Sequence, residues 1–271
     1  MEKRCVIIIP VYKKFPSTTE KAALTQALTI LSAYQFYFVC ANELDVSEYE
    51  TITVKFPNVN ISVKRFNGTY FSTIAGYNKL MLSLTFYQQF SSFKFMLIYQ
   101  LDAWVFRNEL AYWCNQDYDY IGAPWYENQQ QNCKFVGVGN GGFSLRKISS
   151  HIRILKSFSL VIKPGYFYYL LTKDFSLKNV KIVLKCLFFS NNTFHWLNDF
   201  SENEDRFWGL IAVRNFTWFK TPPEKIALKF AVETYPSHFI KSDADLPFGC
   251  HAWEKYDNDF WSSHIKLPNN H

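Results

Sequence analysis

The fold class follows from ten residues in the first half of the chain: Leu97-Ile98-Tyr99-Gln100-Leu101-Asp102-Ala103-Trp104-Val105-Phe106. A mostly apolar run leads into Gln100, Leu101 and Asp102, and a second apolar stretch follows. Such a run before a lone carboxylate is typical of a strand that lies buried in the centre of a sheet. We therefore expect this strand to carry Asp102 to the edge of the sheet.

Strand and helix patterns alternate through the first hundred or so residues. Apolar runs predict strands over 5–10, 35–40, 61–66 and 95–99. Apolar residues at helical spacing predict two helices, one over 17–33 with Thr18 or Thr19 as its N-cap and one over 70–90. This alternation predicts an α/β fold with a doubly wound, mostly parallel sheet flanked by helices. Ligands of such sheets bind beyond the carboxyl ends of the strands, and Asp102 follows such an end.

The second half of the chain is less regular. In chain order we expect a short strand running into a proline-containing loop (118–125), a Gln/Asn-rich loop (128–133), a glycine-dense segment (136–145), a helix (200–212), a strand (230–239) and a loop (248–253). No internal repeat or clear linker occurs. The 271 residues therefore fit a single domain, 1–271.

The composition is that of a folded protein that is rich in aromatic residues. The chain is 48% apolar and 19% aromatic, which excludes an intrinsically disordered protein. No apolar run approaches the roughly eighteen residues of a membrane-spanning helix, and the apolar run near the N-terminus is too short for a signal peptide. The six cysteines are scattered without metal-binding spacing, which is typical of reduced thiols in a cytosolic protein.

Positive charge is concentrated in residues 146–185. This segment holds nine Lys or Arg residues and one acidic residue, Asp174, interleaved with aromatic side chains, while the whole chain has a net charge of +6. Basic and aromatic residues mixed in this way indicate a surface for anionic lipid. An ordinary solvated face is the alternative. Nucleic-acid binding is disfavoured, since no recognised nucleic-acid-binding module accompanies the segment.

Three further segments carry candidate functional residues. Residues 136–146 place four of the ten glycines within six positions; they suit either the floor of a sugar-binding pocket or a tight structural turn. Glu204 and Asp205 stand at the start of the predicted helix, where an acid can cap the helix or act as a general base. His251 is a candidate metal ligand if the fold returns it to Asp102, and a structural histidine otherwise.

Six strings, taken in order, resemble the bacterial glycosyltransferase family catalogued as DUF5672. They are Tyr-Asn-x-Leu (77–80), Gln-Leu-Asp-Ala-Trp-Val-Phe (100–106), Tyr-Asp-Tyr-Ile-Gly-Ala-Pro-Trp (118–125), Gly-Asn-Gly-Gly-Phe-Ser-Leu-Arg (139–146), Glu-Asp-x-Phe-Trp (204–208) and Pro-Phe-Gly-x-His (247–251). The resemblance covers roughly 7–253. It implies a GT-A-like fold and transfer of a sugar from a nucleotide-sugar donor to a glycan acceptor.

The resemblance also implies roles for individual residues. Asp102 and His251 would hold a divalent metal, Mn²⁺ or Mg²⁺, that binds the diphosphate of the donor. Asp205, with Glu204 beside it, would deprotonate the acceptor hydroxyl, giving direct displacement with inversion. Gln100 stands where the Asp-x-Asp motif of such enzymes has its first carboxylate. One anionic ligand is therefore missing, and weaker metal binding is expected.

The rest of the expected site follows from the same resemblance. Residues 1–106 would form the nucleotide-binding half, and 107–271 the acceptor and catalytic half. Donor contacts would come from Val11, Tyr12, Gln100, Asp102, Gly141, Gly142 and Arg146, and acceptor contacts from Trp125 and Trp208. The expected donor is a UDP-sugar. The expected acceptor is a glycan or lipid-linked glycan of bacterial surface polysaccharide or lipopolysaccharide synthesis, at the cytoplasmic face of the membrane.

Two alternatives remain open from the sequence. In a metal-independent transferase, a cationic side chain such as Arg146 replaces the ion. In a catalytically silent module, the chain binds a glycan or nucleotide without turnover.

Overall fold

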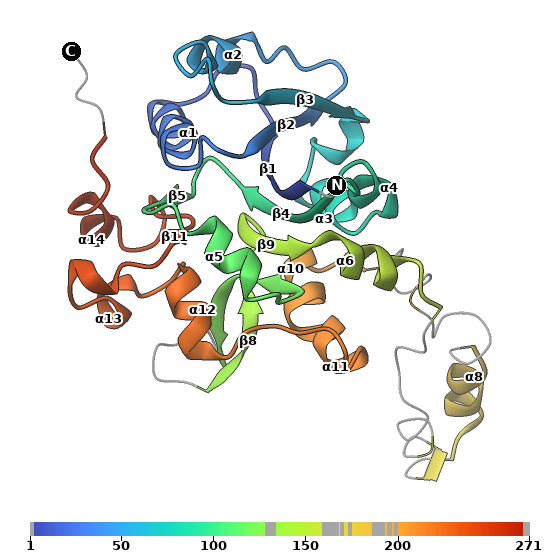
Figure 1. The fold of residues 1–271 in the computed structure, drawn as a ribbon. Coiled ribbons are helices and arrows are strands. Elements are labelled where there is room, and N and C mark those ends of the chain that lie inside the picture. Colours follow the sequence, from blue (N-terminus) through green and yellow to red (C-terminus); the bar gives the residue numbers. More distant parts are fainter. Residues whose placement is uncertain are drawn as a thin grey trace.

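The computed structural model describes residues 3–127, 134–158, 168, 171–172, 175–185, 193, 197 and 200–267. Its centre is a six-stranded sheet with the strand order β3-β2-β1-β4-β9-β6. In chain order, its first four strands are β1 (Lys3–Val11), β2 (Gln35–Ala41), β3 (Ile61–Phe66) and β4 (Phe93–Tyr99). They run parallel, and β9 (Phe143–Lys147) pairs antiparallel with both β4 and β6 (Tyr120–Ile121). The predicted mostly parallel sheet is confirmed, and so are its first four strands (Figure 1).

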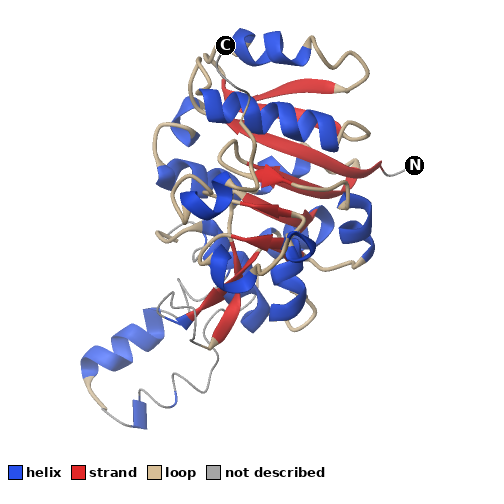
Figure 2. Cartoon of the chain, turned by 90° about the vertical axis from the view of Figure 1, so that its left-hand side faces the viewer, coloured by secondary structure: helices blue, strands red, loops and turns tan. Residues whose placement is uncertain are grey.

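Helices cover both faces of this sheet (Figure 2). The side chains of β1 alternate between the two faces. Ile7 and Ile9 pack on one face with Leu24 and Leu28 of α1 (Thr18–Ile30). Val6 and Ile8 pack on the other face with residues of α3 (Ile74–Met81) and α4 (Leu84–Gln88). Since burying an aliphatic side chain contributes about 1.5–3 kcal/mol, this two-sided core fixes the register of the central strands.

Side-chain hydrogen bonds set the helix boundaries of the first half. Ser17 caps α1 and forms a capping box with Glu20, so the predicted cap at Thr18 or Thr19 is wrong by one or two positions. The single helix expected over 70–90 is two helices, because the Ser83 hydroxyl caps α4 and ends the continuous helical path. A short helix that was not predicted, α2 (Ser47–Thr53), lies between β2 and β3.

Short strands and helices make up the second half. The segment 118–125 contains β6 and the start of β7 (Ala123–Tyr126), which pairs with β8 (Phe135–Gly139). The helix expected over 200–212 begins only at Glu204, with α10 (Glu204–Arg206), and continues as a π-helix (Phe207–Ala212) and α11 (Val213–Asn215). The expected loop 128–133 lies outside the described residues.

The strand predicted over 230–239 is wrong. This region contains the end of α12 (Glu224–Phe230), the two-residue strand β10 (Ala231–Val232) and α13 (Pro236–Phe239). Pro236 begins α13 and donates no backbone hydrogen bond, so the strand pattern cannot continue. The expected loop 248–253 contains β11 (Gly249–Cys250), which joins β10 to β5 (Trp104–Val105) in a small second sheet. This sheet brings His251 back toward Asp102.

The remaining helices pack around the second half or extend from it. They are α5 (Leu110–Asn115), α6 (Ile148–Leu155), α14 (Asn258–Ser262) and α8 (Leu177–Lys185). In the described residues no helix is long and apolar enough to cross a membrane. The four described cysteines are unpaired and buried; Cys133 and Cys186 lie outside the described residues.

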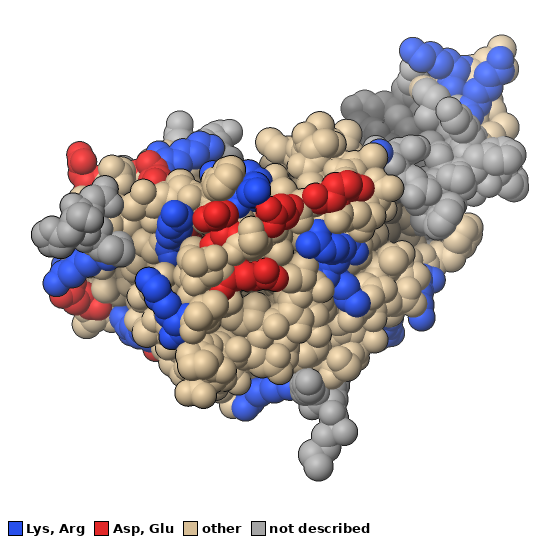
Figure 3. Space-filling model, turned by 90° about the horizontal axis from the view of Figure 1, so that it is seen from above, with Lys and Arg blue, Asp and Glu red and all other residues tan. Residues whose placement is uncertain are grey.

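The described basic residues of the segment 146–185 do not gather on one continuous surface. Arg146 is fully buried, and Lys147 forms an ion pair of 3.0 Å with Asp117. Helix α8, with Lys178 and Lys181, projects away from the body of the molecule (Figure 1). From above, its basic side chains lie apart from the acidic side chains, which gather on the main body (Figure 3). Lys163 and Lys173 lie outside the described residues.

Candidate active site

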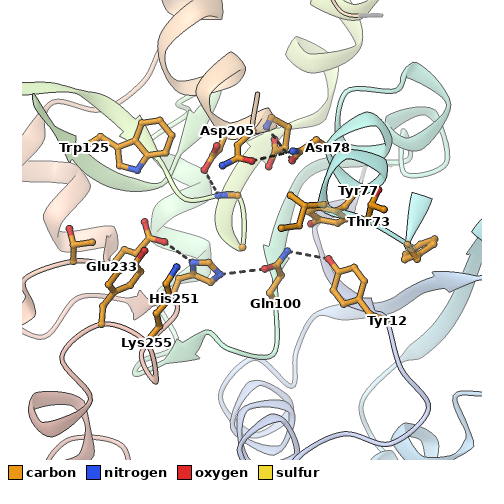
Figure 4. Close-up of a pocket in the computed structure, with 18 of the residues that line it drawn as sticks. Tyr12, Thr73, Tyr77, Asn78, Gln100, Trp125, Asp205, Glu233, His251 and Lys255 are labelled. Atoms are coloured by element: carbon orange, nitrogen blue, oxygen red, sulfur yellow. Dashed lines mark hydrogen bonds and ion pairs between the residues drawn. The ribbon is translucent and has the colours of Figure 1, made fainter. Parts of the chain in front are cut away.

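Two neighbouring pockets open at the carboxyl ends of β1 and β4. The larger pocket, of about 760 Å³, extends from Tyr12 across to β7 and α10. The smaller, of about 320 Å³, is lined by the end of β1, including Val11, and by Asp102. Tyr12 and Gln100 line both pockets, and Gln100 Nε2 donates a hydrogen bond of 3.3 Å to the Tyr12 hydroxyl (Figure 4). The four donor-side residues expected from the first half therefore lie together.

His251 lies between two carboxylates. Its Nε2 is 3.2 Å from Asp102 Oδ1, and its Nδ1 is 3.1 Å from Glu233 Oε1. Burial alone would lower the pKa of His251, but the hydrogen bonds and charges of the two carboxylates raise it to about 10. Burial alone would raise the pKa of Asp102, but the hydrogen bond and charge of His251 hold it below its usual value.

Gln100 completes a convergent set of metal-binding atom types. Its Oε1 lies 3.4 Å from the same His251 Nε2 that faces Asp102. Gly142 makes this convergence sterically feasible, because a Cβ at this position would lie 2.0 Å from His251 Nε2 and 2.7 Å from Gln100 Oε1. Glu233 binds the opposite ring nitrogen, as carboxylates commonly do behind a metal-ligating histidine.

This donor set fits a hard divalent cation, although it is sparse. A carboxylate oxygen, an amide oxygen and an imidazole nitrogen suit Mn²⁺ and, less well, Mg²⁺. Among the described residues, no group of three or more His, Cys, Asp or Glu side chains could hold a metal ion. The set near His251 Nε2 therefore contains two side chains of these types, Asp102 and His251, and the amide oxygen of Gln100.

Asp205 lies across the larger pocket from this set and is held by backbone amides. Its Oδ2 accepts hydrogen bonds from the N–H groups of Asn140 and Gly141 at 3.0 and 3.1 Å, and its Oδ1 accepts one from Arg206 N at 2.8 Å. Asn140 has a positive φ of 75°, which asparagine adopts more readily than most residues, and its Oδ1 accepts a hydrogen bond from Phe143 N within the turn. Burial, opposed by the amide hydrogen bonds, raises the pKa of Asp205. A carboxylate with a raised pKa is a stronger base than an ordinary one.

The structure corrects the expected roles of Arg146 and Glu204. The guanidinium of Arg146 donates to both carboxylate oxygens of Glu204, at 2.8 and 3.0 Å, and the two side chains are 0% and 2% exposed. Burial raises the pKa of Glu204 to about 7 even though Arg146 opposes this shift. Glu204 lines the larger pocket, but its side chain is only 2% exposed and each of its oxygens accepts a hydrogen bond from Arg146, which disfavours it as the base relative to Asp205. Arg146 does not line the larger pocket and cannot contact a donor there.

The two tryptophans expected to bind the acceptor have different surroundings. Trp125 lines the larger pocket. Trp208 is 0% exposed and packs in the core against Tyr87, His151 and Phe219. The expectation for Trp208 is wrong, because the π-helix that follows α10 turns this side chain into the core.

Several pocket residues were missed by sequence reasoning. Glu233 follows β10, the short strand within the region 230–239, and Lys255 lies four residues after His251 on the pocket wall. Neither has a local pattern that signals a site. Tyr77 and Asn78 also line the pocket; they belong to one of the six strings that carry the family resemblance, which was the only signal for them.

The family model for DUF5672, described as a protein of unknown function, matches residues 60–251. The matched region contains Asp102, Asp205 and His251. No curated protein sequence matches the chain.

Among solved structures, the chain is similar to the galactosyltransferase LgtC bound to donor and acceptor sugar analogues. The identity is 10%, the TM-score is 0.51, and the match covers 91% of this chain and 86% of that one. Mouse xyloside xylosyltransferase 1 matches with 11% identity and a TM-score of 0.47 over 93% of this chain and 97% of that one.

The mannosyltransferase Ktr4p from S. cerevisiae matches with 7% identity and a TM-score of 0.42. This match covers 57% of this chain and 60% of that one, so the chain spans less than two thirds of the yeast enzyme. The likeness to LgtC, at this identity, shows the fold. The family and the fold class expected from the sequence are thereby confirmed: the chain belongs to the DUF5672 family and has a GT-A-type fold.

Proposed function

We propose that this protein is a glycosyltransferase that moves a sugar from a nucleotide-sugar donor to a glycan acceptor. One observation supports the proposal most strongly. The side chains of Asp102, Gln100 and His251 converge where the two pockets adjoin, and Asp205 lies across the larger pocket from them. This arrangement provides a place for a diphosphate leaving group and, opposite it, a base for an attacking hydroxyl.

The smaller pocket suits the nucleotide. All of its lining residues lie between Pro10 and Asp102, which supports the assignment of residues 1–106 as the nucleotide-binding half and 107–271 as the acceptor half. Val11 and Tyr12 would contact the nucleoside there. The diphosphate would lie at the junction of the pockets, and the transferred sugar in the larger one, above Gly141 and Gly142. We propose a UDP-sugar as the donor.

Asp102 and His251, with the amide oxygen of Gln100, would hold a divalent metal, Mn²⁺ or Mg²⁺. When bound, the metal neutralises charge on the departing diphosphate. Glu233 orients His251 through its Nδ1, and the missing Cβ of Gly142 leaves room for the three ligands. Lys255, on the same pocket wall, is the cation available to a phosphate in place of Arg146.

Asp205 would accept the proton of the acceptor hydroxyl. The backbone amides of Asn140 and Gly141 fix its carboxylate, and burial raises its pKa. The hydroxyl oxygen would then attack the anomeric carbon as the bond to the diphosphate breaks, giving inversion of configuration. Removal of the proton in the transition state contributes typically about 10²–10⁴ to the rate.

The acceptor would be a glycan, and we propose a lipid-linked one in bacterial surface polysaccharide or lipopolysaccharide synthesis. The basic residues of the 146–185 segment that remain free for it include Lys156, Lys178 and Lys181 of the described part. They would bind anionic lipid at the inner face of the cell membrane and keep a cytoplasmic enzyme at that surface. Changing these three lysines to alanine should abolish binding to vesicles with anionic lipid. Unchanged binding would contradict the proposed membrane binding.

The direct test of the proposal is the release of UDP from a panel of UDP-sugars, with and without Mn²⁺ and glycan acceptors. Turnover that requires Mn²⁺ supports the metal-assisted transferase. Full turnover in chelator supports the metal-independent reaction, for which the neutral Gln100 and the nearby Lys255 are the favouring observations. Nucleotide or glycan binding without any turnover, indifferent to Asp205→Asn, would favour the silent module.

A further inference from the structure

Trp125 presents one face of its indole to the larger pocket and rests its other face on the backbone. It belongs to β7, which pairs with β8. A Cβ on Gly139 of β8 would lie 2.0 Å from Trp125 Cε2 and 2.1 Å from Cζ2, so the ring lies directly against the strand. A glycine at 139 therefore allows the indole to lie flat. The result is a rigid aromatic platform on the pocket wall.

An aromatic platform of this kind suits a pyranose ring. The face of an aromatic ring carries partial negative charge, whereas the C–H bonds on one face of a sugar are apolar and slightly positive. The ring of Trp125 is already fixed by its packing against Gly139 before a ligand binds. It therefore loses little side-chain entropy when a ligand stacks on it.

The charges around this platform are mainly negative. Asp205 lies on the same side of the pocket as Trp125, and Glu233 lies below it (Figure 4). In the described residues, Asp205 accepts hydrogen bonds from backbone amides only and has no cationic side-chain partner. Arg146, a buried cation that follows the glycine-rich turn in the sequence, forms an ion pair with Glu204 instead. The cationic residues of the pocket wall are Lys255 and His251, whose pKa is raised to about 10, and they lie side by side where the diphosphate would bind.

We propose that the acceptor ring seated on Trp125 carries no carboxylate, phosphate or sulfate, and is a neutral or amino sugar. This inference rests on the proposed function. An anionic substituent on that ring would lie near the carboxylate of Asp205, which no cationic side chain of the described residues contacts, in a partly desolvated pocket where like charges repel strongly. The diphosphate of a lipid-linked acceptor would have to lie outside this pocket.

The test uses matched methyl glycosides of glucose, galactose and mannose, each in three forms: the neutral hexose, the 2-amino sugar and the 6-carboxylate. Binding is measured by saturation-transfer NMR in the presence of UDP and Mn²⁺. We expect at least one neutral or amino form to bind, and its carboxylate counterpart to bind at least about tenfold more weakly. Equal or stronger binding of the carboxylate form, or no binding by any member of the panel, would overturn the proposal.

Substitutions of Trp125 test whether its ring is the surface on which the sugar stacks. Trp125→Ala should abolish binding of the preferred sugar, whereas Trp125→Phe should retain part of it. Tyr112→Ala is the matched control, because Tyr112 is an exposed aromatic side chain on α5 outside the larger pocket. Retained sugar binding in Trp125→Ala would contradict the inference.

A parallel titration of UDP separates the two proposals. If UDP binds but the carboxylate sugars are preferred, the charge class of the acceptor is wrong and the transferase proposal stands. If neither UDP nor any other nucleoside diphosphate binds in any condition, the transferase proposal itself fails.

Discussion

Two pairs of acidic and cationic side chains lie on either side of the Gly141–Gly142 turn, and their surroundings differ. Asp102 and His251 face the pockets, with side chains 45% and 13% exposed. Arg146 and Glu204 are sealed in the core at 0% and 2%. In the open pair, the carboxylate of Asp102 keeps lone pairs that a ligand can use, and His251 would free the lone pair of its Nε2 when a metal displaces the proton there. The sealed pair has none free, and its role is to hold the turn and the start of α10, and with them Asp205.

The largest effect should come from breaking the sealed pair. Arg146→Met leaves the Glu204 carboxylate buried without a partner and should destabilise the fold by about 3–5 kcal/mol in urea unfolding. Asp102→Asn, the matched change in the open pair, should destabilise the fold less than Arg146→Met, because Asp102 is 45% exposed, while weakening binding of the nucleotide with Mn²⁺. Equal destabilisation by the two variants would contradict the division of roles.

A second prediction tests whether Asp205 acts as the catalytic base without being required for the fold. Asp205→Asn keeps an oxygen that can accept from the two amides, so the fold and UDP binding should persist. The rate of transfer should fall by about 10²–10⁴ because the base is gone. Glu202→Gln, an exposed acid three residues earlier, is the control and should leave the rate unchanged. Wild-type turnover by Asp205→Asn would exclude it as the base.

The open pair should also govern how the stability of the metal-free protein depends on pH. Because the folded-state pKa of His251 is raised from about 6.5 to about 10, its stabilising contribution is fully present below pH 6.5. It is lost as the pH rises through 10. We expect the Tm to fall between about pH 7 and 10, and His251→Gln to flatten this slope. An identical slope in the variant would show that His251 is not held protonated.

The smallest effect concerns Gln100. Gln100→Asp supplies a second carboxylate at the junction of the pockets and should tighten Mn²⁺ binding without nucleotide by about tenfold, measured by electron paramagnetic resonance of the free ion. Gln100→Asn is the neutral control. No gain in Gln100→Asp would mean that the amide of Gln100 does not face the metal.

The fold was predictable from the sequence where local pattern and burial agree. The apolar runs of β1, β2 and β4 lie in the interior of the sheet and that of β3 at its edge, and all four were recognised within about two residues at each end. Prediction failed where one side chain decides the outcome. The Ser83 hydroxyl divides the helix expected over 70–90, and Pro236 stops the strand expected over 230–239.

The site was predictable only in part, because exposure is a tertiary property. Trp125 and Trp208 both stand in the strings that carry the family resemblance, yet one lines the pocket and the other fills the core. Arg146 and Glu204 are 58 residues apart, and nothing local in the sequence pairs them. Glu233 acts on His251 only because the small sheet places β10 beside β11.

The central claim is that Asp102 and His251 bind a metal together with a nucleoside diphosphate. Isothermal titration of UDP into the protein with Mn²⁺, with excess chelator and with the Asp102→Asn variant tests it most directly. We predict binding with Mn²⁺ that is lost in chelator and strongly weakened in the variant. Equal binding of UDP in all three conditions would contradict the claim.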